Sequence, residues 1–236
     1  MKELFAPLLI LVAIAFAAYT GEPVASQRAV AVPSPTPVTV DSIDRNTSTP
    51  YDGDLAIFEG AERAKNLQID RVMDILKISG DKTVADIGAG SGWFTVRAAK
   101  RTTGKVFAVE INQSYIEHIN KRSSDEKLAN IVTVLGKFDD PALPKDSVDA
   151  VLILKTYHEI EQPIRFMKNL RPALRKGALV GIIDKNGTGD DHGLDRDKVV
   201  DELKRAGFVL KGEYDFVKPD RMDYFLVFTV AEARTK

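Results

Sequence analysis

The chain of 236 residues contains no cysteine, so it has no disulfide, no thiolate metal site and no cysteine nucleophile. It also lacks an excess of basic residues: 33 lysines and arginines stand against 34 acidic residues, for a formal net charge of −1. Domains that bind nucleic acids usually carry such an excess. We therefore expect no nucleic-acid partner. The hydrophobic content of 44% and the charged content of 28% are those of an ordinary folded domain.

The N-terminus differs from this average composition. No charged residue occurs between Leu4 and Gly21, and residues 4–18 are almost wholly apolar. Small residues follow the apolar run, and Ala15-Phe16-Ala17 fits the A-x-A pattern of a signal-peptide cleavage site. The run is also close to the minimum length for a membrane-spanning helix. Residues 1–21 therefore predict a signal peptide or a membrane anchor, with residues 4–21 associated with the membrane in the second case. The protein would then be exported (periplasmic or secreted) or membrane-anchored.

Residues 22–54 form a segment rich in proline, serine and threonine. Proline removes backbone hydrogen-bond donors and favours an extended chain. The segment also has too few apolar residues to become ordered by burying them. This composition predicts a linker. The folded domain is expected to occupy residues 55–236.

Within residues 55–236, short apolar runs alternate with segments of helical periodicity. This alternation predicts an α/β fold in which buried parallel strands are joined by helices. A single helix is expected over residues 62–76. The last two predicted strands, 208–214 and 224–230, are separated only by a short turn, so the final strand should be antiparallel. The expected fold is a Rossmann-like, seven-stranded, mostly parallel sheet with an antiparallel last strand and helices on both faces.

A glycine-rich turn follows the first predicted strand and carries Gly88, Gly90 and Gly92 in a G-x-G-x-G spacing. Glycines allow a sharp turn and a close approach of the backbone to a ligand. The preceding Asp86 would repel the pyrophosphate of a dinucleotide but attract an ammonium group. Glu110, at the end of the next strand, has two carboxylate oxygens that can accept hydrogen bonds from both hydroxyls of a ribose. These residues point to a ligand with an ammonium group and a ribose but no phosphate.

Residues 84–95 resemble the glycine-rich motif of class I S-adenosylmethionine (SAM)-dependent methyltransferases. Other segments resemble later motifs of this family in the correct order: 107–110, 147–159, 174–179 and 204–208. The resemblance implies a methyltransferase with SAM as its cofactor. The residues that would hold SAM in the glycine-rich and ribose motifs are Asp86, Gly88, Ala89, Gly90, Gly92 and Glu110.

One segment departs from the family pattern. The family often has G-D-A after the third strand, where the aspartate contacts adenine, but this chain has Lys137 at the acidic position. Asp139 or the Phe138 backbone is expected to contact adenine instead. Lys155, which directly follows the fourth predicted strand, is also assigned to the cofactor site.

The acceptor is expected to bind beyond the carboxyl ends of the fourth and fifth strands, as ligands do in parallel sheets. Tyr157, His158 and His192 are the candidate catalytic residues there. Tyr157 would orient the acceptor, and His158 would serve as a base, with Glu159 holding its imidazole. The alternative is that Tyr157 packs in the core and His158 caps a loop.

Segments 66–71 and 185–195 are expected to cover this pocket. The acidic residues Asp190 and Asp191 near the histidines could be read as a metal site, but oxygen-rich loops are usually only solvated. We expect no metal site. The acceptor is expected to be a small molecule, and the lack of cysteine argues against arsenic, because an arsenic methyltransferase would be expected to use cysteines.

Two other functions remain open. The domain could bind SAM without turnover, or it could be a nicotinamide-dependent oxidoreductase on a similar sheet. The G-x-G-x-G spacing and the antiparallel last strand count against the oxidoreductase. Only a measurement of turnover separates an enzyme from a SAM-binding module.

Overall fold

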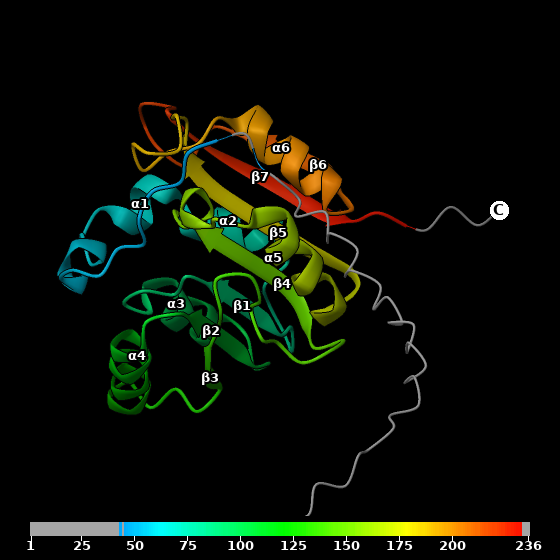
Figure 1. Ribbon diagram of the computed structural model, residues 1–236. Helices are drawn as coiled ribbons and strands as arrows, with labels where there is room; N and C mark the ends of the chain where they lie inside the picture. The colour runs from blue at the N-terminus through cyan, green and yellow to red at the C-terminus, as the bar shows by residue number, and fades with distance from the viewer. Residues whose placement is uncertain (1–42, 44, 233–236) are drawn as a thin grey trace, which may run out of the picture. The chain divides into compact units, whose positions relative to one another are not determined.

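The structure, a computed structural model, describes residue 43 and residues 45–232 (Figure 1). In this part of the chain, no helix has the length and apolar character needed to cross a membrane. The predicted signal peptide or membrane anchor at residues 1–21 lies outside the described residues and stays a prediction.

Seven strands form one sheet, as the sequence predicted. The strands are β1 (Val84–Ile87), β2 (Val106–Glu110), β3 (Ile131–Leu135), β4 (Val148–Leu154), β5 (Leu174–Lys185), β6 (Phe208–Tyr214) and β7 (Asp223–Val230). Their order in the sheet is β3-β2-β1-β4-β5-β7-β6. All pairings among β1 to β5 are parallel, whereas β7 runs antiparallel to both β5 and β6. The predicted Rossmann-like architecture is confirmed.

Helices cover both faces of this sheet. The helices are α1 (Arg63–Leu67), α2 (Ile69–Ile75), α3 (Trp93–Arg101), α4 (Gln113–Asp125), α5 (Pro163–Leu170) and α6 (Arg196–Arg205), with the 3-10 turns η1 (Leu55–Phe58), η2 (Tyr157–Glu159) and η3 (Arg171–Ala173). Alternate residues of β4 enter two different cores: Val151 packs with residues of α5 and α6, and Leu152 packs with residues of α2 and α3. Burial on both faces explains why the β4 sequence is almost continuously apolar.

The expected single helix at residues 62–76 was wrong, because the chain breaks into α1 and α2 at Gln68. Gln68 adopts a left-handed conformation with φ of 47°. In a continuous helix, residues two apart point to nearly opposite sides. The break instead allows both Leu67 and Ile69 to be buried. The Gln68 side chain, which donates a hydrogen bond to the Phe216 carbonyl at 3.1 Å, helps to hold this break.

The prediction of a linker through residue 54 was also wrong for its last part. Residues 45–54, here called the strap, pack on the domain. The Arg45 guanidinium is buried against the Glu202 carboxylate of α6, with an Nε to Oε1 distance of 2.7 Å. The Ser48 side chain is also buried, and the Ser48 amide donates to the His158 carbonyl at 3.3 Å. The strap is ordered by polar contacts, whereas the composition argument considered only apolar burial.

Candidate functional site

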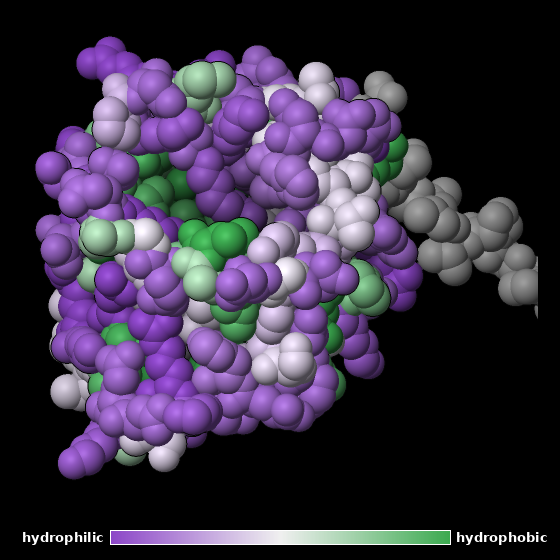
Figure 2. Space-filling view, turned by 90° about the vertical axis from the view of Figure 1, so that its left-hand side faces the viewer, coloured by the Kyte–Doolittle hydropathy of each residue, from purple (hydrophilic) through white to green (hydrophobic). Residues whose placement is uncertain are grey.

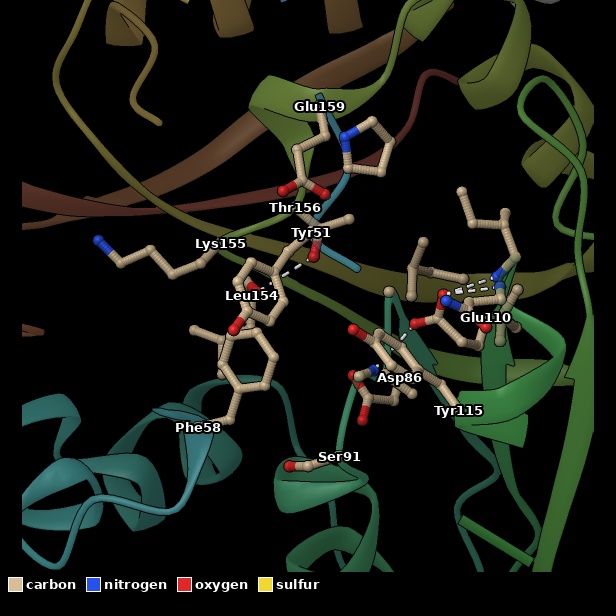
Figure 3. Close-up of a pocket in the computed structure, with 18 of the residues that line it drawn as sticks. Tyr51, Phe58, Asp86, Ser91, Glu110, Tyr115, Leu154, Lys155, Thr156 and Glu159 are labelled. Carbon is tan, nitrogen blue, oxygen red and sulfur yellow. Dashed lines mark hydrogen bonds between the residues drawn. The ribbon is translucent and has the colours of Figure 1, made fainter. Parts of the chain in front are cut away.

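A cavity of about 1010 Å³ opens at the carboxyl ends of the central strands β1, β2 and β4. Figure 2 shows this side of the molecule, with a hollow whose floor is hydrophobic and whose surroundings are hydrophilic. The lining comes from segments that are distant in the sequence: 50–63, 86–94, 109–115, 137–138, 154–166 and residue 192. Figure 3 places Asp86 and Glu110 together on one side of this cavity and Glu159 on another.

The glycine-rich turn forms part of the cavity wall through Gly88, Ala89 and Gly90. Gly88 has φ of +70°, and a Cβ atom built on it would lie 2.4 Å from the Thr156 side chain. Only glycine fits this position, because a larger residue would clash and would also be strained. Gly92 does not line the cavity. It precedes α3 with φ of +75° and packs near Ile119.

The Glu110 carboxylate is buried at the end of β2 and faces the cavity. One of its oxygens accepts a hydrogen bond from the Gly90 amide at 2.9 Å. The other accepts from the Ile111 and Asn112 amides at 2.8 and 3.1 Å. These three donors fix the orientation of the carboxylate and use three of its about four lone-pair directions, which leaves one, on the oxygen that accepts from Gly90, for a ligand hydroxyl.

Asp86 is a buried acid at the cavity wall, only 2% exposed. Burial raises the pKa of this carboxyl to about 6, although a hydrogen bond from the Thr95 hydroxyl and the charge of Arg63 both lower it. The Thr95 Oγ1 to Asp86 Oδ2 distance is 2.6 Å. Arg63 lines the same cavity, with its guanidinium 4.5 Å from the centre of the Trp93 ring.

On the predicted adenine side, Phe138 lines the cavity with a largely exposed ring, and Lys137 lines it as well. Asp139, which was predicted to contact the cofactor, does not line the cavity. Its carboxylate instead forms an ion pair with Arg165 of α5 at 3.0 Å. Lys155 does line the cavity, and its ammonium is paired with the buried carboxylate of Asp223.

The placement of Tyr157 differs from the prediction that it would face an acceptor. Its side chain is fully buried, joins the core beside α5 and α6, and does not line the cavity. The Arg45 guanidinium lies 5.7 Å from the centre of the Tyr157 ring. Since η2 turns Tyr157 into the core, the alternative reading, in which this tyrosine only packs, describes the observed structure.

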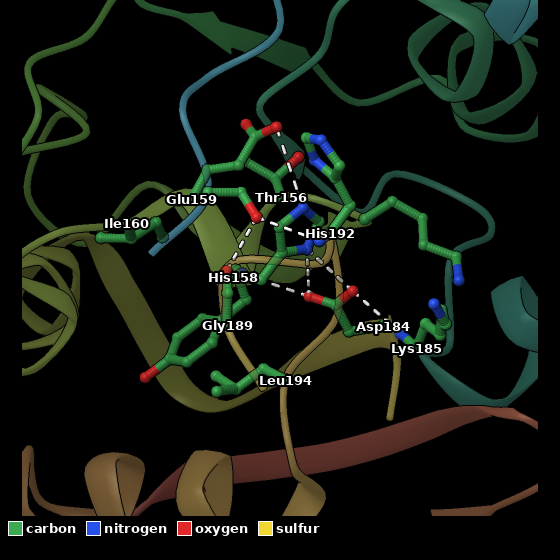
Figure 4. A network of polar contacts seen from close by, with 12 residues as sticks. Thr156, His158, Glu159, Ile160, Asp184, Lys185, Gly189, His192 and Leu194 are labelled. Carbon is green, nitrogen blue, oxygen red and sulfur yellow. Dashed lines mark hydrogen bonds and ion pairs between the residues drawn. The ribbon is translucent and has the colours of Figure 1, made fainter. Parts of the chain in front are cut away.

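His158 follows Tyr157 in η2 and lines the cavity, although it is only 3% exposed. Its Nδ1 atom lies 2.9 Å from both carboxylate oxygens of Asp184, at the end of β5 (Figure 4). Asp184 is fully buried and also accepts from the His158 and Lys185 backbone amides, at 3.2 and 2.9 Å. Since an ionised carboxylate can only accept, Nδ1 carries a proton, and the lone pair of the imidazole, when the ring has one, lies on Nε2. Asp184, rather than the predicted Glu159, holds the imidazole.

Glu159 and His192 lie next to this ring and also line the cavity. The Nε2 atom of His158 is 3.8 Å from Oε1 of Glu159, and the His158 and His192 rings meet edge to face with centres 5.7 Å apart. Burial raises the pKa of Glu159 to about 7, although the neighbouring His158 lowers it. The structure therefore brings together both histidines that the sequence singled out.

The cover of the cavity was only partly predicted. Residues 66–71 do not line it, and from the 185–195 loop only His192 does. The covering residues are instead Tyr51 of the strap, Phe58 of η1 and Arg63 of α1. The Tyr51 and Phe58 rings meet edge to face at 5.4 Å. Aromatic residues at the end of a proline-rich segment were the sequence signal that this stretch belongs to the domain.

Comparison with known proteins gives consistent similarities. Residues 84–177 match the profile of a family described as a methyltransferase domain. A 23S rRNA (uracil-C5)-methyltransferase of Alcanivorax borkumensis is 41% identical over 71 residues, which cover 28% of this chain and 16% of that protein. An uncharacterised methyltransferase of Mycobacterium tuberculosis is 28% identical over 122 residues, or 52% of this chain and 47% of that protein. The chain thus spans half or less of the length of these relatives.

Comparison with solved structures gives a similar result for the fold. A solved structure of a SAM-dependent methyltransferase from Aquifex aeolicus superposes with a TM-score of 0.69 at 18% identity. The match covers 76% of this chain and all of that one. At this identity the superposition supports the fold alone.

Proposed function

We propose that this chain is a class I SAM-dependent methyltransferase and that it transfers the methyl group of SAM to a small molecule bound in the same cavity. The observation that carries the proposal is the cavity of about 1010 Å³, with a glycine turn and two buried acids on one side and two histidines on another. Sites for drug-sized ligands are typically about 300–1,000 Å³, so this volume can hold SAM and a small acceptor together.

The residues on the cofactor side fit SAM in charge and shape. Glu110 accepts a hydrogen bond from a ribose hydroxyl on the oxygen that faces Gly90, and Asp86 attracts the ammonium group of the amino-acid tail. Gly88 keeps the wall free of a side chain, and Phe138 offers its ring to adenine. The sulfonium group of SAM supplies the electrophilic methyl, and the protein holds the acceptor in line with it, so that proximity and orientation provide much of the rate.

A small acceptor is favoured because His158, Glu159 and His192 line the same cavity as Asp86 and Glu110. The rRNA methyltransferase among the relatives acts on a nucleic acid, but the net charge of −1 gives this chain no general attraction for phosphate backbones.

Calorimetric titration of SAM, and separately of NADH, into the full chain tests the cofactor assignment. We expect SAM to bind and NADH not to bind. In Glu110→Gln the affinity for SAM should fall about 10- to 100-fold, because a hydrogen bond to a charged group contributes about 1.5–3 kcal/mol. Glu117→Gln, on the exposed side of α4, is the matched control and should bind like the original chain.

Release of S-adenosylhomocysteine across a panel of small-molecule acceptors then tests turnover. Binding of SAM with no product from any acceptor, including nucleic acid and protein, would support a SAM-binding module instead of an enzyme. Binding of NADH in place of SAM would contradict the proposal and favour an oxidoreductase.

A further inference from the structure

The side-chain cluster of His158, Glu159 and His192 contains three groups of the kind that bind metal ions. One nitrogen from each imidazole and one oxygen of the carboxylate all lie within 4.8 Å of one another. The groups come from two segments, η2 and the loop between β5 and α6, which meet only in the folded chain (Figure 4).

The orientation of His158 is set by a partner behind it. Asp184 accepts the Nδ1 proton, so the Nε2 lone pair is available on the side of Glu159. A carboxylate that accepts the second ring N–H is the usual partner of a metal-binding histidine, because it fixes the tautomer and raises the basicity of the ligand. Asp184 is itself held by two backbone amides and is fully buried.

The distance between the His158 and Glu159 ligand atoms also suits a metal ion. The Nε2 atom of His158 and Oε1 of Glu159 are 3.8 Å apart, beyond hydrogen-bond distance. A tetrahedral ion with bonds of about 2.1 Å holds its ligand atoms about 3.4 Å apart, so this pair is already close to the required separation. The side chain of His192 is exposed and lines the cavity, and one of its ring nitrogens lies within 4.8 Å of the other two ligand atoms.

We infer that His158, Glu159 and His192 form a binding site for a divalent first-row transition metal ion, with Asp184 as the positioning residue of His158. Two imidazoles and one carboxylate suit Zn²⁺, Fe²⁺, Co²⁺ and related ions. Three protein ligands leave coordination positions open, as in catalytic metal sites. These positions face the cavity and would take an oxygen of the acceptor. That role rests on the proposed function, whereas the metal site does not.

This inference replaces the expectation that the chain has no metal site. The acids first considered, Asp190 and Asp191, have other contacts: Asp190 accepts from the Thr188 hydroxyl, and Asp191 accepts from the Thr188 amide. Glu159 supplies the carboxylate instead. It is adjacent to His158 in the sequence, where no metal-ligand spacing draws attention to it.

Titration of Co²⁺ into the full, untagged chain after dialysis against EDTA tests the site, because bound Co²⁺ gives visible absorption bands that report its ligands. We expect one Co²⁺ per chain, displaced by Zn²⁺. His192→Ala removes an exposed ligand without opening the core. The loss of a residue that only hydrogen-bonds to a ligand usually lowers metal affinity about 10- to 100-fold, so the loss of the His192 ligand itself should lower the Co²⁺ affinity by more than this. His118→Ala, on the exposed side of α4, is the matched control and should leave binding unchanged.

Asp184→Asn tests the positioning role. It should retain one Co²⁺ with an affinity lowered about 10- to 100-fold and with shifted absorption bands. If the Asp184→Asn variant does not fold, the comparison of His192→Ala with His118→Ala still tests the metal site. The inference is overturned if no Co²⁺ binds, if His192→Ala binds as the original chain does, or if His118→Ala loses binding equally.

The SAM titration separates this inference from the proposed function. SAM binding to a chain that takes up no Co²⁺ overturns the metal site alone. Co²⁺ binding, lost in His192→Ala, by a chain that binds no SAM supports the metal site and contradicts the proposed cofactor.

Discussion

Replacement of Arg45 by methionine removes the guanidinium of a buried ion pair while keeping most of the apolar stem. The Arg45 and Glu202 side chains are only 1% and 5% exposed. The guanidinium also donates to the backbone carbonyls of Tyr157, His158 and Ile160, at 3.4, 3.4 and 3.2 Å. Without it, the Glu202 carboxylate stays buried and loses the charge partner found for it among the described residues.

The loss of one partner from a buried pair costs about 3–5 kcal/mol. For a domain of this size, 1 kcal/mol corresponds to about 2–4 °C, so Arg45→Met should lower the melting temperature by about 6–20 °C. Circular dichroism melts and urea titrations of the full chain provide the measurement. Arg45→Met combined with Glu202→Gln should recover part of the loss, because the second change removes the unpaired charge.

Lys65→Met is the matched control, since Lys65 pairs with Glu62 on the surface, where both side chains are largely exposed. Such pairs contribute about 0–1 kcal/mol. If Arg45→Met destabilises the chain no more than Lys65→Met does, the strap is not packed on the domain as described, and the reasoning fails.

Two further predictions concern the cofactor side. Asp86, whose pKa is raised to about 6, is ionised above that pH, so its attraction for an ammonium group is lost as the pH falls. The affinity for SAM should drop about tenfold between about pH 7 and pH 5 in calorimetry; a drop that persists in Asp86→Asn would contradict this cause. Gly88→Ala should destabilise the chain by about 1–3 kcal/mol more than Gly80→Ala in thermal melts, because both have positive φ but only Gly88 meets a side chain at 2.4 Å. Equal melting temperatures would refute the clash.

The sheet, and the placement of the glycine turn and Glu110 at the cavity, could be predicted because their signals are local in the sequence. Buried strands are short apolar runs, and the glycine turn and Glu110 lie at fixed places next to such runs. The antiparallel β7 followed from the length of a single turn. Each of these features depends on a few neighbouring residues and needs no knowledge of distant contacts.

The part of the cavity around His158 depends on contacts that sequence spacing does not encode. Asp184 is 26 positions from His158, and Arg45 is 157 positions from Glu202. The chain also leaves β4 through Lys155 with a positive φ of 56°, so strand alternation no longer says which side the next residue faces. For that reason Tyr157 was assigned to the cavity, although η2 turns it into the core.

The strap has a consequence for how binding and stability are linked. Ser48 donates from its hydroxyl to the Gly189 carbonyl at 2.7 Å and accepts from the His192 amide at 3.1 Å, while its own amide donates to the His158 carbonyl. One residue thus bridges the two segments that carry the histidines. By thermodynamic reciprocity, a ligand that binds better when the strap joins these segments must also stabilise the packing of the strap on the domain. Cleavage or detachment of the strap must then reduce the affinity for that ligand by the same free energy.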